Sequence, residues 1–445
     1  MPTFKRAARP FLLMAFLLLL ASTAAVAQIE RISVAGDGSQ ADRGSYQGVL
    51  SDDGSVVAFR SNATNLIAGD TNGWPDIFLR DLVAGTTERI SLTTGGGQVS
   101  SYSKAPSISS DGQIIAFEGR SGGITTVQVY DRATGTVADP LPDTFSGAAT
   151  TPAQARVDPA VSGDGRLFVF ATTSTLANLF PGSIRPKTTD SDTTPDIYLY
   201  DLDTAPTPPV ERVSSLSDSN EINADNRNPA LSETGQYVVF ESFSDQLNND
   251  SNSEGDILLK DRNSGLLQLV SVTPAGVSGN AASLEGAVSD DGNVVAFRSD
   301  ASDLVTGDTN DRLDIFVRDI GAGTTVRVSV SSDGSEANQN SLEPEISGDG
   351  RFVVFRSNAT NLVPDDSNQR PDIFVHDRVG GTTARVGQPP GEQSNGSSSA
   401  PAISGDGQWI VFESDASNLV PGDTNEARDV FRAPNPLFTA VTAAQ

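Results

Sequence analysis

One short phrase returns seven times along this chain of 445 residues and strongly limits how the chain can fold. The phrase is Ser, a variable residue, Asp and Gly, followed by alternating apolar residues that end in Phe, with Thr replacing Asp in one copy. It begins at Ser51, Ser109, Ser162, Ser232, Ser289, Ser347 and Ser404, so the usual spacing is close to 57 residues. A constant period of this length indicates that each copy is one supersecondary unit of a repeat architecture.

Each repeat unit predicts four short β-strands. In the sixth unit these are "EPEIS", "RFVVFRS", "DIFVHD" and "TTARVG", which alternate between apolar and polar residues and are bounded by Gly, Asp, Asn and Pro. Asp349-Gly350 predicts a tight turn between the first two strands, because glycine supplies the positive φ that such a turn requires. Four-stranded antiparallel sheets repeated around an axis are the blades of a β-propeller. We therefore predict an all-β fold, a seven-bladed β-propeller.

The two ends of the repeat region are out of phase with the units. The segment "IERISV" at residues 29–34 matches the fourth strand of other units, such as "TVRVSV" at residues 325–330, whereas the seventh unit has no clear fourth strand after "RDVFRA" at residues 428–433. We expect the N-terminal strand to pair antiparallel with residues 428–433 and so close the ring. The alternative is closure by "LFTAVT" at residues 437–442, although Pro434 and Pro436 precede it.

The repeated phrase, followed by "DIF" and a third strand, resembles the TolB-type (WD40-like) propeller repeat. The resemblance covers residues 29 to 433, nearly all of the chain after its N-terminal segment. It implies a β-propeller. Propellers of this kind serve as binding platforms, as accessory domains of peptidases and sometimes as enzymes, so the resemblance predicts the fold more sharply than the function.

The N-terminal segment predicts export. Lys5, Arg6 and Arg9 form a basic region, an apolar run follows, and "AVA" precedes Gln28, as in a cleaved signal peptide. The alternative is an uncleaved membrane anchor, but the apolar run is about half the roughly 20 residues that a spanning helix needs. We therefore expect a signal peptide at residues 1–27, a propeller at 28–434 and a C-terminal tail at 435–445. The exported protein would be periplasmic or secreted, without stable membrane insertion after cleavage.

The charge balance excludes several partners and chemistries. Asp and Glu number 57 against 30 Lys and Arg, a net charge of −27, which repels nucleic acid and anionic lipid. The chain has no cysteine, so thiol chemistry and disulfides are excluded, and its one histidine is His376. His376 occupies a strand position that carries Arg80, Lys260 or Arg318 in other units, so we expect no catalytic role for it and no catalytic residue elsewhere. We expect a monomer.

An acidic loop precedes the third strand in six of the seven units. It has Asp, any residue, Asn or Asp, then three residues and Asp, and the opening resembles the first two ligand positions of an EF-hand loop. One interpretation is that these side chains form Asx-turns that order the loop, with no cofactor. The alternative is calcium binding at some loops. The residues are Asp70, Asn72, Asp76; Asp190, Asp192, Asp196; Asp250, Asn252, Asp256; Asp308, Asn310, Asp314; Asp366, Asn368, Asp372; and Asp423, Asn425, Asp429.

The first strand of each unit is predicted to line the central channel. Two residues before the Ser of the phrase, most units have a small residue, but the sixth has Glu345. Two residues earlier, the units vary and are mostly polar, which suggests a ligand-binding rim at the channel mouth. The alternative is a solvated rim without a ligand. The candidate residues are Gln47, Arg156, Asp158, Asn228, Glu285, Glu343 and Glu345.

Three functions fit these observations. The leading hypothesis is a non-catalytic module that binds a ligand or a protein, with another envelope or secreted protein as the expected partner. The second is a hydrolase or lyase that acts on a glycan through carboxylates at the channel mouth, because two acids suffice for glycoside chemistry. The third is a structural secreted repeat protein stabilised by calcium.

Overall fold

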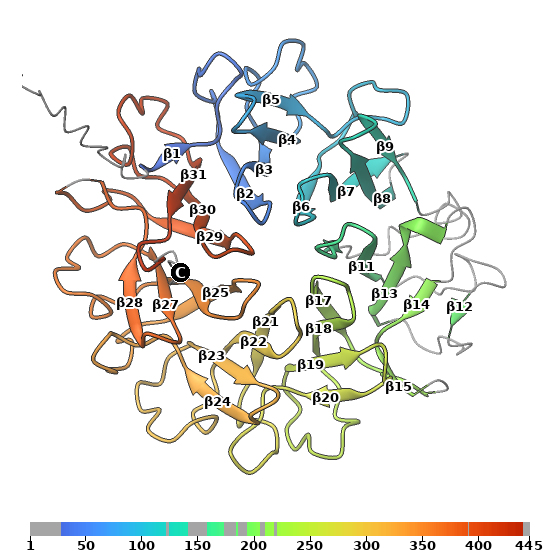
Figure 1. The fold of residues 1–445 in the computed structure, drawn as a ribbon, viewed down its shortest axis with the longest axis vertical. Coiled ribbons are helices and arrows are strands. Elements are labelled where there is room, and N and C mark those ends of the chain that lie inside the picture. The colour runs from blue at the N-terminus through green and yellow to red at the C-terminus, as the bar shows by residue number, and fades with distance from the viewer. Residues whose placement is uncertain are drawn as a thin grey trace, which may run out of the picture.

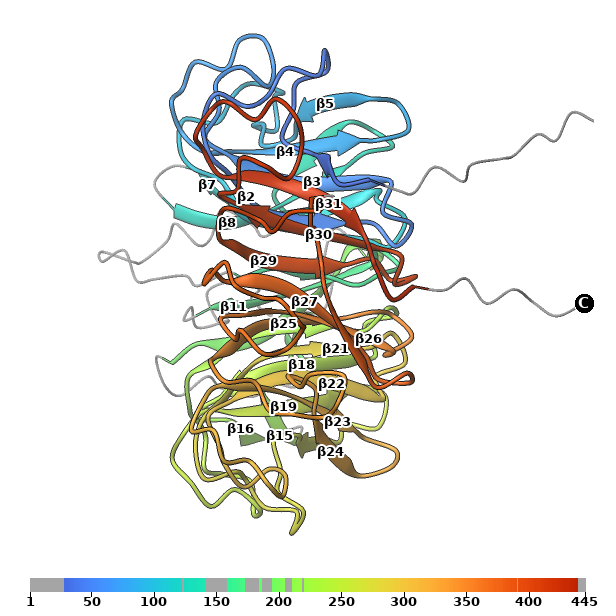
Figure 2. The ribbon, with the colours of Figure 1, turned by 90° about the vertical axis from the view of Figure 1, so that its left-hand side faces the viewer.

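The structure, a computed structural model, describes residues 28–121, 124–140, 158–172, 184–185, 194–204, 210–217, 220–389 and 391–438. These residues form seven antiparallel blades around a central axis, which confirms the predicted seven-bladed β-propeller (Figure 1). Seen from the side, the strands of successive blades stack around the ring (Figure 2). The predicted signal peptide at residues 1–27 and residues 439–445 of the tail lie outside the described residues.

Blades 1 to 3 follow one another along the chain. Blade 1 comprises β2 (Ser45–Leu50), β3 (Val56–Ser61), β4 (Asp76–Asp81) and β5 (Thr86–Arg89). Blade 2 comprises β6 (Lys104–Ile108), β7 (Ile114–Ser121), β8 (Ile124–Asp131) and β9 (Thr136–Ala138). Blade 3 comprises β10 (Ala160–Val161), β11 (Leu167–Thr172), β13 (Asp196–Asp201) and β14 (Val210–Arg212), and β12 (Ile184–Arg185) adds a parallel strand beyond β14. The sequence did not predict this fifth strand.

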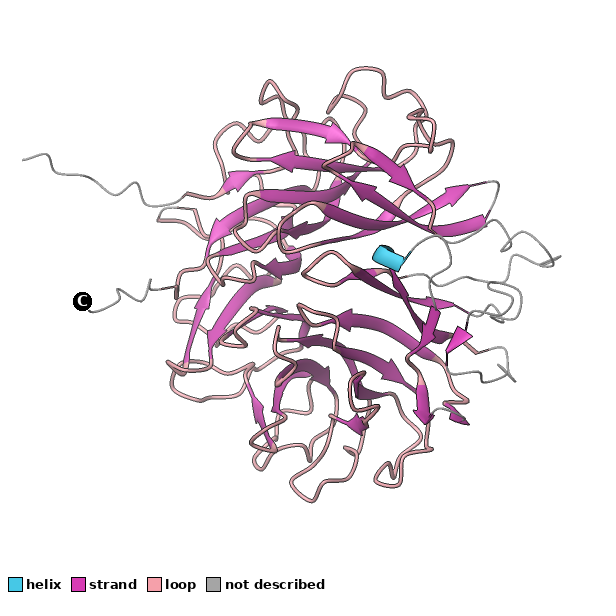
Figure 3. Ribbon diagram, turned by 45° about the vertical axis from the view of Figure 1, so that its right-hand side comes forward, coloured by secondary structure: helices cyan, strands magenta, loops and turns pink. Residues whose placement is uncertain are grey.

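A short helix and a small hairpin accompany blade 3. The 3-10 helix η3 (Leu202–Thr204) follows β13 and is drawn in cyan among the strands of Figure 3. The hairpin pairs β15 (Ser215–Ser217) with β16 (Asn220–Glu221) between blades 3 and 4. No helix in the described part of the chain is long and apolar enough to cross a membrane.

Blades 4 to 7 complete the ring. Blade 4 comprises β17 (Asn226–Leu231), β18 (Tyr237–Ser242), β19 (Asp256–Asp261) and β20 (Leu267–Leu269). Blade 5 comprises β21 (Ser283–Val288), β22 (Val294–Ser299), β23 (Asp314–Asp319) and β24 (Thr324–Arg327). Blade 6 comprises β25 (Ser341–Ile346), β26 (Phe352–Ser357), β27 (Asp372–Asp377) and β28 (Thr382–Arg385). Blade 7 comprises β29 (Ser398–Ile403), β30 (Trp409–Ser414), β31 (Asp429–Pro434) and β1 (Glu30–Arg31).

The first strand of the chain closes the ring, as predicted. β1 pairs antiparallel with β31, with Glu30 opposite Arg432 and Arg31 opposite Phe431. The contact continues past the strand, because Ile32 N donates to Val430 O at 2.8 Å and Ser33 Oγ donates to Asp429 Oδ1 at 2.6 Å. In Figure 1 the blue β1 lies beside the red β31. Joining the two ends in one sheet satisfies backbone groups that an open edge would leave unpaired.

The repeated phrase forms the turn between the first two strands of each blade. In blade 1, Ser51 Oγ donates to Asp53 Oδ1 at 2.7 Å, and Asp53 Oδ1 also accepts from Ser55 N at 2.9 Å. Gly54 has a φ of 67°, which the turn requires and which glycine adopts without a steric cost. The serines of the phrase are buried at 0–1% exposure, so they hold each turn from the inside.

The core lies between neighbouring blades rather than within them. Each hydrophobic cluster joins two adjacent sheets, and the clusters follow one another around the ring. The Phe that ends the repeated phrase stacks on the Phe of the third strand, as in the pair Phe59 and Phe78, whose ring centroids lie 5.8 Å apart. Equivalent stacked pairs recur in blades 5, 6 and 7. The same contact therefore stabilises each of these blades from the same sequence positions.

Candidate functional site

A cavity of about 520 Å³ lies on the propeller axis, and we call it the axial cavity. The innermost strands of the blades line it, with the loop before β10 in blade 3. Six of the seven predicted rim residues contribute to its wall, namely Gln47, Asp158, Asn228, Glu285, Glu343 and Glu345. Arg156, the seventh, lies outside the described residues. The sequence therefore predicted where these six side chains lie, whereas binding at this place stays a prediction.

The varied rim position has an unusual backbone conformation. Six residues at this position have φ between 47° and 58°, in the left-handed region that non-glycine residues rarely adopt: Gln47, Ala105, Asn228, Glu285, Glu343 and Ala400. Each lies at a β-bulge, where one extra residue shifts the register between the first and second strands. Strand alternation alone could not reveal this bulge. The bulge breaks the alternation, so the backbone N–H of the rim residue turns away from its own blade.

Side-chain oxygens of the preceding blade accept these N–H groups. Glu285 Oε2 accepts from Glu343 N at 2.9 Å, and Glu343 Oε2 accepts from Ala400 N at 2.7 Å. Gln47 Oε1 accepts from Ala105 N at 3.2 Å in the same way. Three of the predicted rim residues thus link neighbouring blades, a role that the sequence analysis missed.

Where the rim side chain is short, a glutamate from the second strand takes its place. Glu413 Oε1 accepts from Gln47 N at 2.6 Å across the junction between blades 7 and 1. Glu241 Oε1 accepts from Glu285 N at 2.7 Å and also from Asn228 Nδ2 at 2.8 Å. Burial raises the pKa of Glu413, while the bond from Gln47 N and the charge of Arg428, 3.3 Å away, oppose this rise.

Glu345 differs from Glu285 and Glu343, since the described residues offer it no hydrogen bond or ion pair. Its side chain is accessible to solvent from the cavity. Desolvation of the carboxyl between the inner strands is the larger cause of a pKa raised to about 7, solvent access through the cavity limits this effect, and the nearby Glu285 carboxylate adds to the rise. By contrast, Glu285 and Glu343 each lie beside an arginine, Arg298 at 3.0 Å and Arg356 at 3.3 Å.

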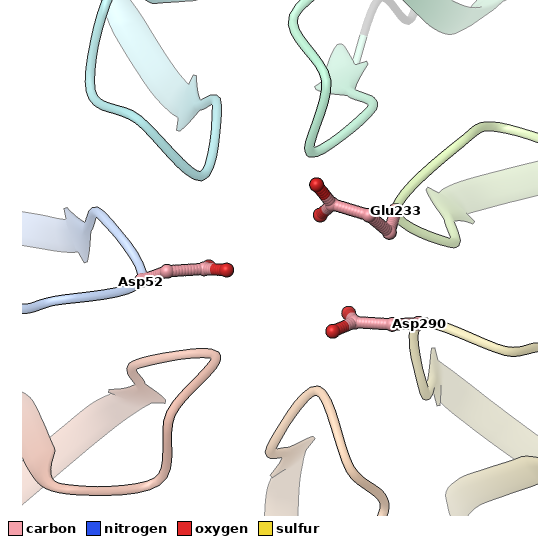
Figure 4. A group of neighbouring side chains, drawn as sticks. All are labelled: Asp52, Glu233 and Asp290. Carbon is pink, nitrogen blue, oxygen red and sulfur yellow. The ribbon is translucent and has the colours of Figure 1, made fainter.

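A second acidic group lies at the other end of the same strands. The variable residue of each repeated phrase, at Asp52, Ser110, Gly163, Glu233, Asp290, Gly348 and Gly405, forms what we call the turn ring. Asp52, Glu233 and Asp290 point from three blades toward the axis, with carboxylate oxygens within 4.8 Å of one another (Figure 4). Burial raises the pKa of Asp290 to about 6, and the charges of Asp52 and Glu233 contribute. The sequence analysis missed this group, although the variation at this position was a visible signal.

Glycine at three positions of the turn ring leaves space for these carboxylates. A Cβ on Gly163 would overlap the Glu233 carboxylate, one on Gly348 the Asp290 carboxylate, and one on Gly405 the Asp52 carboxylate. Backbone hydrogen bonds link the turns of neighbouring blades, including Asp52 N to Ser110 O and Asp290 N to Gly348 O, both at 2.9 Å. Ser110 Oγ donates to Glu233 Oε2 at 2.6 Å. The turn ring is thus closely packed around its acids.

The acidic loops lie at the outside of the blades and are mostly paired with arginine. In blade 6, Arg385 Nη1 lies 3.1 Å from Asp366 Oδ1 and 3.2 Å from Asp372 Oδ2. The central Asn forms an Asx-turn, as when Arg370 N donates to Asn368 Oδ1 at 2.9 Å. Equivalent Asx-turns occur at Asn72, Asn252, Asn310 and Asn425. This supports the Asx-turn interpretation; Asp190 and Asp192 lie outside the described residues, and calcium binding stays a prediction.

His376 lies in β27, away from the axial cavity, and is 7% exposed. Its Nδ1 lies 2.9 Å from Thr383 Oγ1, the contact that Arg80 and Arg318 make with Thr87 and Thr325 in blades 1 and 5. Burial lowers the pKa of the imidazole. His376 therefore occupies an ordinary strand position, as the repeat comparison predicted.

The fold and the site define the chain as a seven-bladed β-propeller with an acidic axial cavity. No family model matches it, and no curated protein matches it by sequence. Among solved structures, an oligogalacturonate lyase from Vibrio parahaemolyticus is similar over 93% of this chain and 98% of its own, with a TM-score of 0.53 and 13% identity. An acylaminoacyl peptidase is similar over 88% of this chain and 51% of its own, with a TM-score of 0.52 and 10% identity.

TolB from Acinetobacter baumannii is also among the similar structures, at 14% identity and a TM-score of 0.41. The match covers 88% of this chain but only 64% of the TolB chain. For the lyase and the peptidase, likeness at 13% and 10% identity reflects a shared fold. Six of the described blades have four strands and blade 3 has five, which is the propeller architecture that the repeats predicted.

Proposed function

We propose that this protein is an exported binding module that receives a positively charged group in its axial cavity. One observation carries the proposal: Asp158, Glu285, Glu343 and Glu345 line the cavity, and no described Lys, Arg or His does. A concave site with protein walls concentrates the field of its charges, and the net charge of −27 adds to the attraction for cations. The predicted signal peptide supports export.

Glu345 is the residue we expect to contact the ligand. Glu285 and Glu343 already hold a backbone N–H of the next blade and lie beside an arginine. Glu345 has no such partner, and its environment disfavours the ionised form. A cation placed against it would restore the ionised carboxylate, because an opposite charge lowers a carboxyl pKa. The cavity volume suits a lysine or arginine side chain presented by another exported protein.

A binding experiment tests this function. A labelled hexa-lysine peptide should bind the protein at low salt, and Glu345→Gln should weaken binding about ten-fold, the effect expected for one desolvated charge pair. Glu392→Gln is the matched control, because this substitution removes the same charge from a residue that is exposed on an outer loop. Equal affinities of the two variants for the peptide would show that net charge alone accounts for the binding, and would contradict the proposal. Affinity capture from the native envelope and culture fluid then identifies the partner.

The two neighbouring acids Glu285 and Glu345 in one cavity favour one second candidate, a glycan-active enzyme. A carboxyl group with a pKa near 7 beside another acid can act as a general acid at neutral pH. A neutral glycan would suit the cavity better than a polyanion such as oligogalacturonate, because the lining is acidic. Release of reducing ends from neutral glycans, lost in Glu345→Gln and retained in Glu392→Gln, would favour the enzyme over the binding module.

A further inference from the structure

The acidic loops share a charge pattern in five blades. An arginine lies against the loop aspartates, and it comes from the strand that pairs with the outer edge of the third strand in each of these blades. In blade 5, Arg327 Nη1 lies 3.0 Å from Asp308 Oδ1 and 3.4 Å from Asp314 Oδ2. The arginine stands directly across the ladder from the aromatic residue of the third strand, as Arg327 does from Phe316. The corresponding arginines are Arg31, Arg89, Arg212, Arg327 and Arg385.

Blade 4 has the loop without its arginine. Leu269 stands opposite Leu258, the ladder position that the arginine fills in the other blades. Ser278 occupies the position that carries Gln98 in blade 1 and Glu336 in blade 5, since all three form the same isolated bridge. Two long polar side chains are therefore replaced by shorter ones around this loop, and the loop acids lose their counter-charge.

The absence of the arginine leaves a buried oxygen without a partner. Asp256 is 1% exposed, and its Oδ1 accepts a hydrogen bond from Ser271 Oγ at 2.5 Å. Its Oδ2 has no hydrogen-bond partner among the described residues. Asn252 Nδ2 donates to Gly279 O at 2.7 Å, and the Asn252 side chain lies near enough to Asp256 to lower the pKa of that carboxyl. In blade 6 the equivalent oxygen, Asp372 Oδ2, has two partners: Asn368 Nδ2 at 2.9 Å and Arg385 Nη1 at 3.2 Å. A buried carboxylate oxygen without a partner is costly.

The loop of blade 4 also carries more negative charge than its counterparts in blades 1, 5, 6 and 7. Its sequence, "DSNSEGD" at residues 250–256, places Glu254 where blades 5 and 6 have Arg312 and Arg370. Asp, Asn and Glu thus alternate at the first, third and fifth positions, and Gly255 follows at the sixth, the spacing with which EF-hand loops begin. Burial raises the pKa of Asp256, and the charges of Asp250 and Glu254 add to the rise.

We propose that the blade 4 loop is a Ca²⁺ site in which the ion replaces the missing arginine. Asp256 Oδ2 is the expected anchoring ligand. The carboxylate oxygens of Asp250, Glu254 and Asp256 do not all lie within 4.8 Å of one another in the structure, so the first two side chains would turn toward the ion, and backbone carbonyl oxygens or water complete the shell. Ca²⁺ accepts six to eight oxygen ligands in flexible geometry, so an irregular loop suits it better than it suits Mg²⁺. The site lies at the outside of blade 4, apart from the axial cavity, and it does not depend on the function proposed above.

The test compares the purified protein with a variant that introduces the missing arginine into blade 4 and with variants that alter a single loop aspartate. Calorimetric titration with CaCl₂ should show one site per chain, and saturating Ca²⁺ should raise Tm by about 3 °C or more, because the ion binds only the folded state. Leu269→Arg rebuilds the pattern of the other blades. It should fold, abolish the Ca²⁺ response, and match or exceed the Tm of the metal-free parent. Asp256→Asn should weaken Ca²⁺ binding at least ten-fold, whereas Asp372→Asn in blade 6 should leave it unchanged.

The same measurements define what would overturn the proposal. Absence of a Ca²⁺ response in the parent protein would contradict it, as would full Ca²⁺ affinity in a folded Leu269→Arg variant. Binding that survives both blade 4 substitutions but disappears in Asp290→Asn would assign the ion to the turn ring instead. An equal response to MgCl₂ would contradict the preference for Ca²⁺.

Discussion

At the axial cavity, Glu413 accepts the N–H of Gln47 and lies beside Arg428, whereas at the turn ring Asp52, Glu233 and Asp290 face one another and form no described salt bridge. Glu413 lies on a second strand beside one end of the inner strands, and the turn ring lies at their other end; burial raises the pKa of Glu413 and of Asp290. The difference lies in the neighbours that each carboxylate receives. A carboxylate that holds a buried N–H stabilises the ring, whereas one that faces other carboxylates costs stability. The same chemical substitution should therefore have opposite effects at the two places.

The largest effect is expected at the junction of blades 7 and 1. Glu413→Ala removes the acceptor of Gln47 N and the partner of Arg428, so it should lower the free energy of unfolding by about 2–3 kcal/mol, the cost of stranding buried polar groups. Urea denaturation measures the change. Glu392→Ala, on an exposed loop, serves as the control and should change stability by less than about 0.5 kcal/mol. If Glu413→Ala left the free energy of unfolding unchanged, the backbone N–H of Gln47 at the bulge would have to donate to water instead.

The glycines of the turn ring provide the next test. Gly163→Ala places a Cβ where the Glu233 carboxylate lies, so Glu233 must move away from Ser110, at a cost of about 1 kcal/mol. Adding Glu233→Ala should remove most of that cost, because the double variant no longer contains the clashing group. A double-mutant cycle measures this coupling. Additive effects of the two substitutions would show that Gly163 is not needed for the carboxylate.

Neighbouring residues of one turn should respond in opposite directions. The folded-state pKa of Asp290 is about 6, above the ordinary value of 3.8, so the folded protein binds more protons between these pH values and loses stability as pH rises through them. Asp290→Asn should therefore raise Tm by about 1–2 °C at pH 8, a gain limited by the exposure of Asp290 to solvent, and have little effect near pH 4.

Asp291→Ala is the contrasting variant. It removes the acceptor of Ser289 Oγ and Asn293 N, so it should lower Tm at pH 8. Melting curves at the two pH values decide the comparison. A fall in Tm for both variants at pH 8 would show that Asp290 contributes a favourable interaction despite its acidic neighbours.

The smallest effect on stability is expected at Glu345, an acid of the axial cavity to which the described residues offer no hydrogen bond or ion pair. Its pKa is raised from 4.5 to about 7, so its ionisation lowers stability as pH rises through that range. Glu345→Gln should raise Tm by about 1 °C at pH 8 and not at pH 4, a small gain because the side chain reaches solvent. Thermal melts of the variant and the parent protein, with and without hexa-lysine, test this. The Tm difference between the two proteins at pH 8 should vanish when the peptide is bound to the parent protein. A loss of stability would place Glu345 with the supporting acids instead.

The sequence alone determined most of the fold because the signals for it are local and repeated. Alternation, the Asp-Gly turns and the period of about 57 residues predicted four-stranded blades, and a phase shift between the chain ends predicted the pairing of β1 with β31. Alternation also predicted that Gln47, Glu285 and Glu345 face the axis. These features depend on backbone geometry within one unit, which a single stretch of sequence encodes.

Only the tertiary structure decided what these residues contact. The β-bulge that turns Glu343 N toward Glu285, the convergence of Asp52 with Glu233 and Asp290, and the unpaired Asp256 Oδ2 all join groups from different strands or blades. Which oxygen accepts from which N–H or pairs with which cation depends on differences of a few tenths of an ångström in the distances between these elements. Comparison of the repeats shows that a position varies, as at Leu269. Only the packing of the strands shows that this variation leaves a buried carboxylate without its arginine.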